Sequence, residues 1–135
     1  MGFLAPHADK IYAAFRIMTG LLMLQHGCQK LLGWFGGIPE GMMPAPMLYG
    51  LGSIELFASL LVVIGLYAAP AAFLLSGTMA AAFFIGHAFS DRNATGTLIP
   101  LLNGGELAVL YCFAFLLIAS KGSGIWSVDA ARGAK

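Results

Sequence analysis

Four long apolar stretches dominate the chain and limit what it can fold into. A transmembrane helix needs about 20 predominantly apolar residues, with a range of about 17–25. Four segments meet this requirement: residues 11–33, 47–68, 70–89 and 103–120. In lipid a backbone must satisfy its own hydrogen bonds, which for one chain of this size means helices. We therefore predict an all-α integral membrane protein, with residues 1–135 forming a single four-helix bundle domain.

The composition supports a membrane protein and disfavours other classes. Hydrophobic residues make up 59% of the 135 residues and charged residues only 10%, against about 45–50% and 25% in an ordinary soluble domain. A chain this short cannot hide so much apolar surface from water. Disorder and nucleic-acid binding are excluded, and a soluble enzyme is disfavoured. The main partner is therefore the lipid bilayer.

Basic residues near the span ends predict the orientation. With four spans both termini share one side, and membrane proteins carry more Lys and Arg on the cytoplasmic side. The side of the termini holds more of them than the opposite side: Lys10, Lys121, Arg132 and Lys135, against Lys30 and Arg92. We predict a multi-pass protein of a cell membrane, a bacterial inner membrane, with both termini cytoplasmic. Residues 121–135 then form a cytoplasmic tail.

Polar side chains inside the spans mark the candidate site. A charged residue in a span costs several kcal/mol, so it faces the bundle or water and needs a partner. Counted at about 1.5 Å of rise per residue, one group on four spans falls in the outer leaflet: His26, Lys30, Glu55, His87, Asn103 and Glu106. Their neighbours Gln25, Gln29 and Arg92 are further candidates. The inner half holds chiefly Arg16, whose guanidinium we expect to extend to the cytoplasmic surface. We predict that the outer-leaflet residues converge on one ligand-binding site.

Each polar residue also has a structural interpretation. Glu55 lies in the middle of a span, where it serves in proton exchange or in a salt bridge to Lys30 or Arg92. The segment Asn103–Glu106 fits an N-cap with a glutamate three residues later, a capping box. Small residues at Gly20 and Gly27 predict close helix packing on the first span.

The order of several short motifs resembles the DoxX family of small four-helix membrane proteins. The matching segments are Arg16–Gly20, His26–Leu31, Gly52–Glu55, Gly65–Leu66, Asn103–Tyr111 and Gly122–Asp129. The resemblance covers about residues 10–130. It implies a membrane subunit like the one associated with thiosulfate:quinone oxidoreductase, although no universal set of catalytic residues accompanies the motifs. Any enzymatic role would need partner chains, either other membrane proteins or copies in a homo-oligomer.

The first functional hypothesis is a subunit of a redox system that interacts with quinone through the outer-leaflet polar cluster. A quinone needs an apolar slot with a few polar groups at its carbonyl oxygens. His26 or Lys30 would donate to a carbonyl, and Glu55 or Glu106 would exchange protons. The sequence carries no haem, flavin or iron–sulfur motif, so electrons would come from elsewhere. Three aromatic residues are candidates to line the slot: Trp34, Phe35 and Tyr111.

Other functions stay open at this point. The chain could be a non-catalytic accessory or assembly subunit that docks on a larger membrane complex, with the polar cluster as an internal lock. A copper site is a weaker alternative, because the polar cluster and nearby soft side chains are acceptable ligands: His26, Glu55, His87, Glu106, Met23, Met42, Met43, Met47 and Cys28. No diagnostic ligand spacing occurs and Lys30 would repel a cation, so we assign no metal ligand. A transporter role would require an oligomer.

Overall fold

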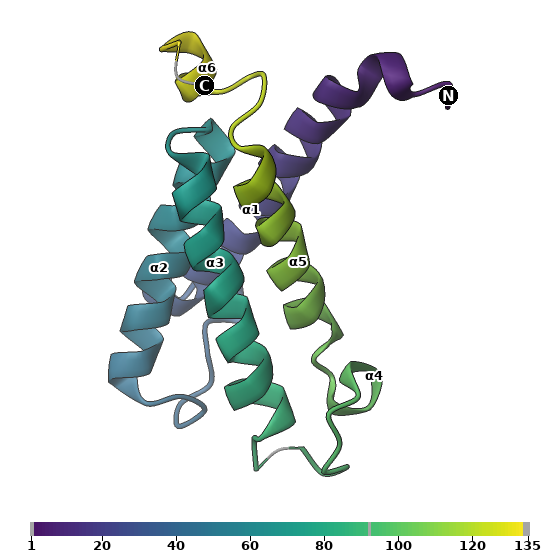
Figure 1. Ribbon diagram of the computed structural model, residues 1–135. Coiled ribbons are helices and arrows are strands. Elements are labelled where there is room, and N and C mark those ends of the chain that lie inside the picture. The colour runs from purple at the N-terminus through teal and green to yellow at the C-terminus, as the bar shows by residue number, and fades with distance from the viewer. Residues whose placement is uncertain (1, 92, 134–135) are drawn as a thin grey trace.

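The computed structural model describes residues 2–91 and 93–133, and every regular element in these ranges is helical. Four main helices form a bundle and alternate in direction, and α3 continues into a π-helical turn, η3 (Figure 1). The main elements are α1 (Ala8–Leu32), α2 (Ala45–Ile64), α3 (Ala68–Phe83) with η3 (Phe84–Ala88), and α5 (Glu106–Lys121). The short ones are η1 (Ala5–His7), η2 (Trp34–Gly36), α4 (Pro100–Asn103) and α6 (Val128–Ala131). The predicted all-α fold with four main helices is confirmed.

Two of the four helices are long and apolar enough to cross a membrane, α2 and the continuous α3–η3 segment. Helix α5 has 16 residues, which at 1.5 Å per residue is shorter than the roughly 30 Å hydrocarbon layer. Helix α1 has 25 residues but carries Arg16 and the polar run 25–30. Membrane crossing by α1 and α5 therefore remains a prediction. The start of α1 and the short α6 lie at the same end of the bundle (Figure 1), as four alternating helices require.

Helix boundaries differ most from expectation at the fourth span. The apolar pattern predicts a helix from residue 103, but α4 ends at Asn103 and α5 starts at Glu106. Gly104, with φ of 74°, takes the left-handed conformation between them, which glycine adopts without steric cost. The capping-box prediction is wrong, because Gly105 is the N-cap of α5 and the Asn103 side chain accepts from the Gly105 amide at 2.9 Å.

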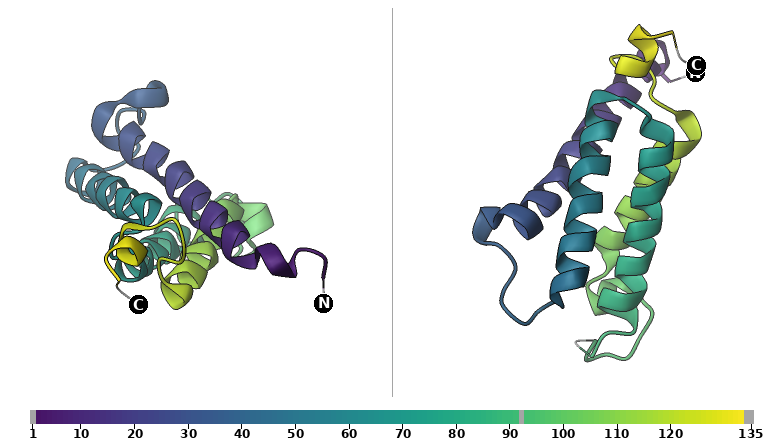
Figure 2. Two further views of the ribbon diagram at one scale, coloured as in Figure 1. Left: turned by 90° about the horizontal axis from the view of Figure 1, so that it is seen from above. Right: turned by 90° about the vertical axis from the view of Figure 1, so that its left-hand side faces the viewer.

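Glycines bring α1 and α2 into close backbone contact, as predicted for Gly20 and Gly27. A Cβ atom at Gly27 would lie 2.5 Å from the Leu56 backbone nitrogen, and one at Gly20 would lie 2.7 Å from a Val63 methyl. Helix α1 crosses the bundle obliquely and packs chiefly on α2, while α3 packs on α5 (Figure 2). The glycine contacts fix where α1 crosses α2.

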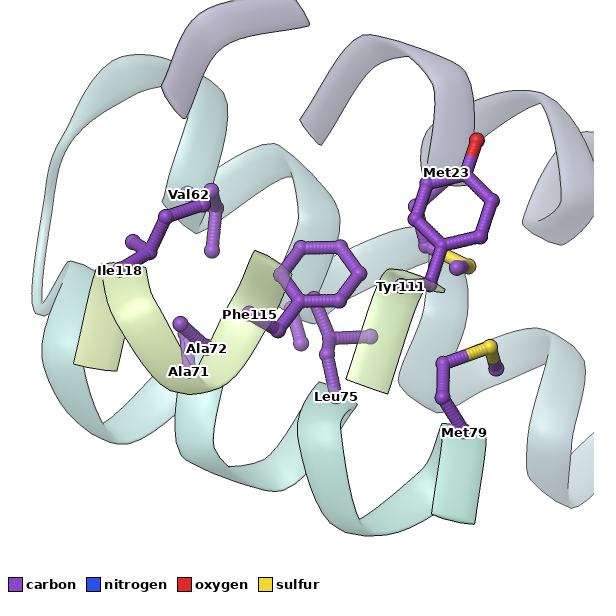
Figure 3. Packing of buried hydrophobic residues seen from close by; sticks show 10 residues of the cluster. Met23, Val62, Ala71, Ala72, Leu75, Met79, Tyr111, Phe115 and Ile118 are labelled. Carbon is purple, nitrogen blue, oxygen red and sulfur yellow. The ribbon is translucent and has the colours of Figure 1, made fainter. Parts of the chain in front are cut away.

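The apolar core is formed by side chains from all four main helices (Figure 3). Helix α5 contributes a stripe at helical spacing that ends in Phe115 and Ile118, both fully buried. These pack against α2 and α3, where Val62, Ala72 and Leu75 are also fully buried. The small residues Ala71 and Ala72 on α3 let α5 approach closely. The resulting apolar layer lies next to the polar residues of the bundle.

Arg16 does not reach the surface, so the prediction of an extended guanidinium is wrong. Its side chain is fully buried. Nη1 donates to the carbonyls of Val62 and Val63 at 2.5 and 2.8 Å, and Nη2 donates to Trp126 at 2.8 Å. The final carbonyls of a helix have no partners within the helix and carry partial negative charge. Arg16 supplies both partners and positive charge, and so joins α1, the end of α2 and the tail.

The tail folds back onto the bundle instead of lying free. The Asp129 amide donates to the Gly65 carbonyl at 3.0 Å, and the Tyr12 hydroxyl donates to the Gly122 carbonyl at 2.5 Å. Trp126, which is 60% exposed, adopts a left-handed backbone with φ of 56°. That strained conformation accompanies the placement of its carbonyl against Arg16. The predicted cytoplasmic location of residues 121–135 remains a prediction.

Candidate functional site

A pocket of about 260 Å³ lies at the end of the bundle where α1 and α3 finish and α2 and α5 begin. Its wall combines four of the predicted polar residues with apolar side chains from α1, α3 and α5, and α2 contributes Glu55. The lining residues are Met23, His26, Lys30, Glu55, Met79, Ala82, His87, Gly104, Leu107, Ala108 and Tyr111. We call this the polar pocket. It is mostly apolar with a few convergent polar groups, which is the usual character of a small-molecule site.

Lys30 and Glu55 form a salt bridge across the α1–α2 contact. The Lys30 ammonium nitrogen lies 2.5 Å from Glu55 Oε2, and the two side chains are 11% and 4% exposed. The close packing at Gly27 and Gly52 brings these helices together, since a Cβ on Gly52 would lie 2.9 Å from Lys30 Cβ. The Ser59 hydroxyl donates to the Glu55 carbonyl. Of the two salt-bridge partners expected for Glu55, the structure shows Lys30; Arg92 lies outside the described residues.

His26 lies one turn before Lys30 on the same face of α1. Its ring meets the Tyr111 ring edge to face, with centroids 6.2 Å apart and planes at 86°. Tyr111 in turn stacks on Phe115, with centroids at 5.9 Å. This aromatic contact connects α1 to α5 and holds the imidazole at the pocket wall.

His87 enters the pocket from the π-helical turn η3. A π-helical turn changes the direction of side chains relative to an α-helix and is frequent at functional sites. His87 Nδ1 lies 3.3 Å from the Asn103 carbonyl oxygen. The contact ties η3 to α4 and holds the imidazole at the pocket wall.

Asn103 and Glu106 occupy different positions from the other predicted residues. Asn103 touches the site only through its carbonyl, because its amide group bonds Thr97 and Gly105. Glu106 is exposed and lines a separate surface hollow with Pro100 and Phe113. The structure therefore brings His26, Lys30, Glu55 and His87 together and leaves the Glu106 carboxylate outside the polar pocket.

The neighbouring candidates do not line the pocket. Gln25 is exposed, and Gln29 donates to the Gly37 carbonyl at 3.1 Å. Of the aromatic candidates, Tyr111 lines the pocket, whereas Trp34 and Phe35 are 56% and 68% exposed on η2. Among the described residues, no group of three or more His, Cys, Asp or Glu side chains is arranged to hold a metal ion. This arrangement gives the copper alternative no support.

Sequence reasoning named Tyr111 as part of the apolar wall and Met23 only as a possible copper ligand, and it missed the remaining apolar residues. Met23, Met79 and Leu107 line the pocket but look like ordinary core residues in the sequence. A usable signal was present on α1, where Met23 lies three residues before His26 and therefore shares its face.

The fold and the site define a small helical membrane protein with a polar pocket among its main helices. The DoxX family model matches residues 11–88. An uncharacterized protein of Haemophilus influenzae is 35% identical over 133 residues, which is 96% of both chains. The chain belongs to the DoxX family. The motif Asn103–Tyr111 lies beyond the family match but within the span shared with this relative. No solved structure matches the chain.

Proposed function

We propose that this DoxX protein is a membrane subunit of a redox system and binds the head group of a quinone in the polar pocket. The observation that carries the proposal is the placement of an ammonium, a carboxylate and two imidazoles in one otherwise apolar wall. A quinone ring has carbonyl oxygens at opposite ends, and both need hydrogen-bond donors. Lys30 and His26 on α1 and His87 on η3 supply donors from two different elements of the pocket wall, which suits a ring with two carbonyl oxygens.

The pocket size and its apolar surfaces suit a small ring. Its volume of about 260 Å³ lies just below the range of about 300–1,000 Å³ typical of sites for drug-sized ligands. Met23 and Met79 offer flexible, polarisable side chains that adapt to a flat ring. Tyr111 supplies an aromatic face. The apolar wall orients the ring, and the polar groups fix its carbonyls.

The chain's own chemistry in this function is proton handling. Glu55 is buried against Lys30, so its carboxylate can accept a proton when the ammonium turns toward a ligand oxygen. The imidazoles of His26 and His87 offer ring nitrogens that can donate a hydrogen bond to a ligand oxygen or accept one. Electrons come from a partner chain in this proposal. The polar pocket lies in the outer leaflet of a bacterial inner membrane, with both termini in the cytoplasm.

A binding titration with a matched carboxylate control tests this function. The probe is 2,3-dimethoxy-5-methyl-1,4-benzoquinone, added to the purified protein and followed by native mass spectrometry. We expect Glu55→Gln and His26→Gln to weaken binding by at least about tenfold, and Glu106→Gln to bind like the wild type because that carboxylate lies outside the polar pocket. Thermal melting of each variant separates lost binding from lost folding. Equal affinity of the wild type and both pocket variants would refute the proposal.

A non-catalytic accessory role has one specific observation in its favour. The Lys30–Glu55 pair fills part of the pocket and joins α1 to α2, as an internal lock would. Under this role Glu55→Gln lowers the amount of protein or of its complex in the membrane and no quinone binds to the wild type. Quantifying abundance and co-purifying chains alongside the titration distinguishes the two functions.

A further inference from the structure

A second hollow adjoins the polar pocket and shares two of its lining residues. This groove, of about 520 Å³, runs between α1 and α5. Leu107 and Tyr111 line both hollows. The remaining groove residues are Ile11, Ala14, Phe15, Met18, Thr19, Leu22, Leu110 and Ala114. Leu107 and Tyr111 form the wall that the two hollows share, which we call the junction, with polar groups on one side and apolar side chains on the other.

The groove is open on the outside of the bundle. Met18 is 57% exposed on the α1 side and Leu110 is 67% exposed on the α5 side. Helix α1 lies obliquely across the bundle (Figure 2) and contacts α5 far less than it contacts α2. Exposed apolar walls of this kind face lipid chains in a membrane protein. A molecule in the groove therefore has direct access to the bilayer.

Tyr111 stands at the junction with an available polar group. Its ring is held by Phe115 and His26, while its hydroxyl points away from Leu75 and the core (Figure 3). Among the hydrogen bonds of the described residues, none uses this hydroxyl. The hydroxyl is not one of the enclosed polar atoms without a partner among the described residues, so it is accessible from outside the core. A polar atom of a ligand passing from the groove to the pocket would provide a partner.

We infer that the groove holds the apolar tail of the ligand whose head group occupies the polar pocket. This inference rests on the proposed function and makes the ligand an isoprenoid quinone rather than a water-soluble one. The quinone reaches the pocket sideways from the bilayer between α1 and α5. The shared wall at Leu107 and Tyr111 selects this occupant, because the two hollows are neighbours and the head and tail of such a quinone are joined in one molecule.

Filling the groove tests the inference. Two probes are compared in nanodiscs, the tail-less benzoquinone named above and the same ring carrying a two-unit isoprenoid tail. Ala114→Phe puts a ring into the groove from α5, and Met18→Trp fills it from α1 should the first variant not fold. We expect either variant to bind the tailed quinone at least about tenfold more weakly than the wild type, and the tail-less ring unchanged. Each variant is compared with the wild type for one probe at a time. The partitioning of that probe into lipid is then the same in both measurements and does not affect the ratio of the two affinities.

A bulky substitution outside the groove serves as the control. Ala81 is exposed on α3 and lines neither hollow, so Ala81→Phe should bind both probes like the wild type. If both probes bind the groove variants as they bind the wild type, the inference fails and the proposed function stands. If the tail-less ring does not bind the wild type at all, the proposed function itself fails. If the variants lose a co-purified phospholipid but no affinity for the tailed probe, the groove is a lipid site and the inference is overturned.

Discussion

Replacing Gly27 with alanine should separate α1 from α2 and destabilise the protein. The added Cβ would lie 2.5 Å from the Leu56 nitrogen and 2.7 Å from its Cα. An optimal nonbonded contact is about 3.5 Å or more, so the backbones must separate by about 1 Å. Neither atom belongs to a side chain that could rotate away. Gly77 is the matched control, because it lies in α3 with no atom within 4 Å of an added Cβ.

Two free-energy contributions decide the stability of these variants: a gain in helix propensity that both share, and a steric cost that only Gly27→Ala carries. Alanine is favoured over glycine in a helix interior by about 1 kcal/mol, and this gain applies to both positions. Overpacking a well-packed contact costs about 1–3 kcal/mol and applies only to Gly27. The difference in unfolding free energy between the variants therefore equals the steric cost. For a chain of this size, 1 kcal/mol corresponds to a shift in melting temperature of roughly 3–6 °C.

Thermal unfolding of both variants in the same detergent measures this difference. We expect Gly77→Ala to melt at or above the wild-type temperature and Gly27→Ala at least about 3 °C below Gly77→Ala. Equal melting temperatures would show that the helices are not in backbone contact at Gly27. In that case the geometry that brings Lys30 to Glu55 would also have to be revised.

Three further outcomes are expected. Arg16→Met should release the tail, seen as faster hydrogen exchange at the Asp129 amide, whereas unchanged exchange would show that the tail is held by other contacts. Tyr12→Phe should lower the unfolding free energy by about 0.5–1.5 kcal/mol through loss of its bond to Gly122, as measured by chemical denaturation; no change would place that hydroxyl in lipid headgroups or water. Glu55→Leu should be less stable than the double variant with Lys30→Met, because removing one partner leaves a buried charge unpaired; a double variant that is equally unstable contradicts the salt bridge.

Much of the fold follows from the sequence because its main signals are local. Runs of about 20 apolar residues define the four helices, and successive segments that each cross a bilayer must alternate in direction. Alternation puts the end of α1, the start of α2 and the end of α3 at one level. This is why the sequence alone assigns His26, Lys30, Glu55 and His87 to a common site.

The wrong predictions concern two properties that a local sequence pattern does not contain: contacts with residues far along the chain, and the rotation of a helix about its own axis. The carbonyls that receive the Arg16 guanidinium lie 46 and 110 positions along the chain, and no local pattern reveals them. Glu106 has the expected depth but the wrong direction. It lies two positions before Ala108, about 200° around the helix, and Ala108 belongs to the buried stripe of α5. The depth of a residue in the membrane can be counted from the sequence. Which side of a short apolar helix faces the core is decided by packing against the other helices.

The position of Arg16 also has a consequence for the order in which the protein matures. The residue leaves the ribosome early, in the first helix, but two of its four carbonyl acceptors belong to Ile125 and Trp126. Until that segment has been synthesised and folded back, half of the acceptors of a buried cation are missing, at a site where an unpaired charge is costly. Where α1 crosses the membrane as predicted, nascent chains that stop before residue 125 therefore present an arginine with only two of its four acceptors. Quality-control proteases could recognise this difference between unfinished and finished copies.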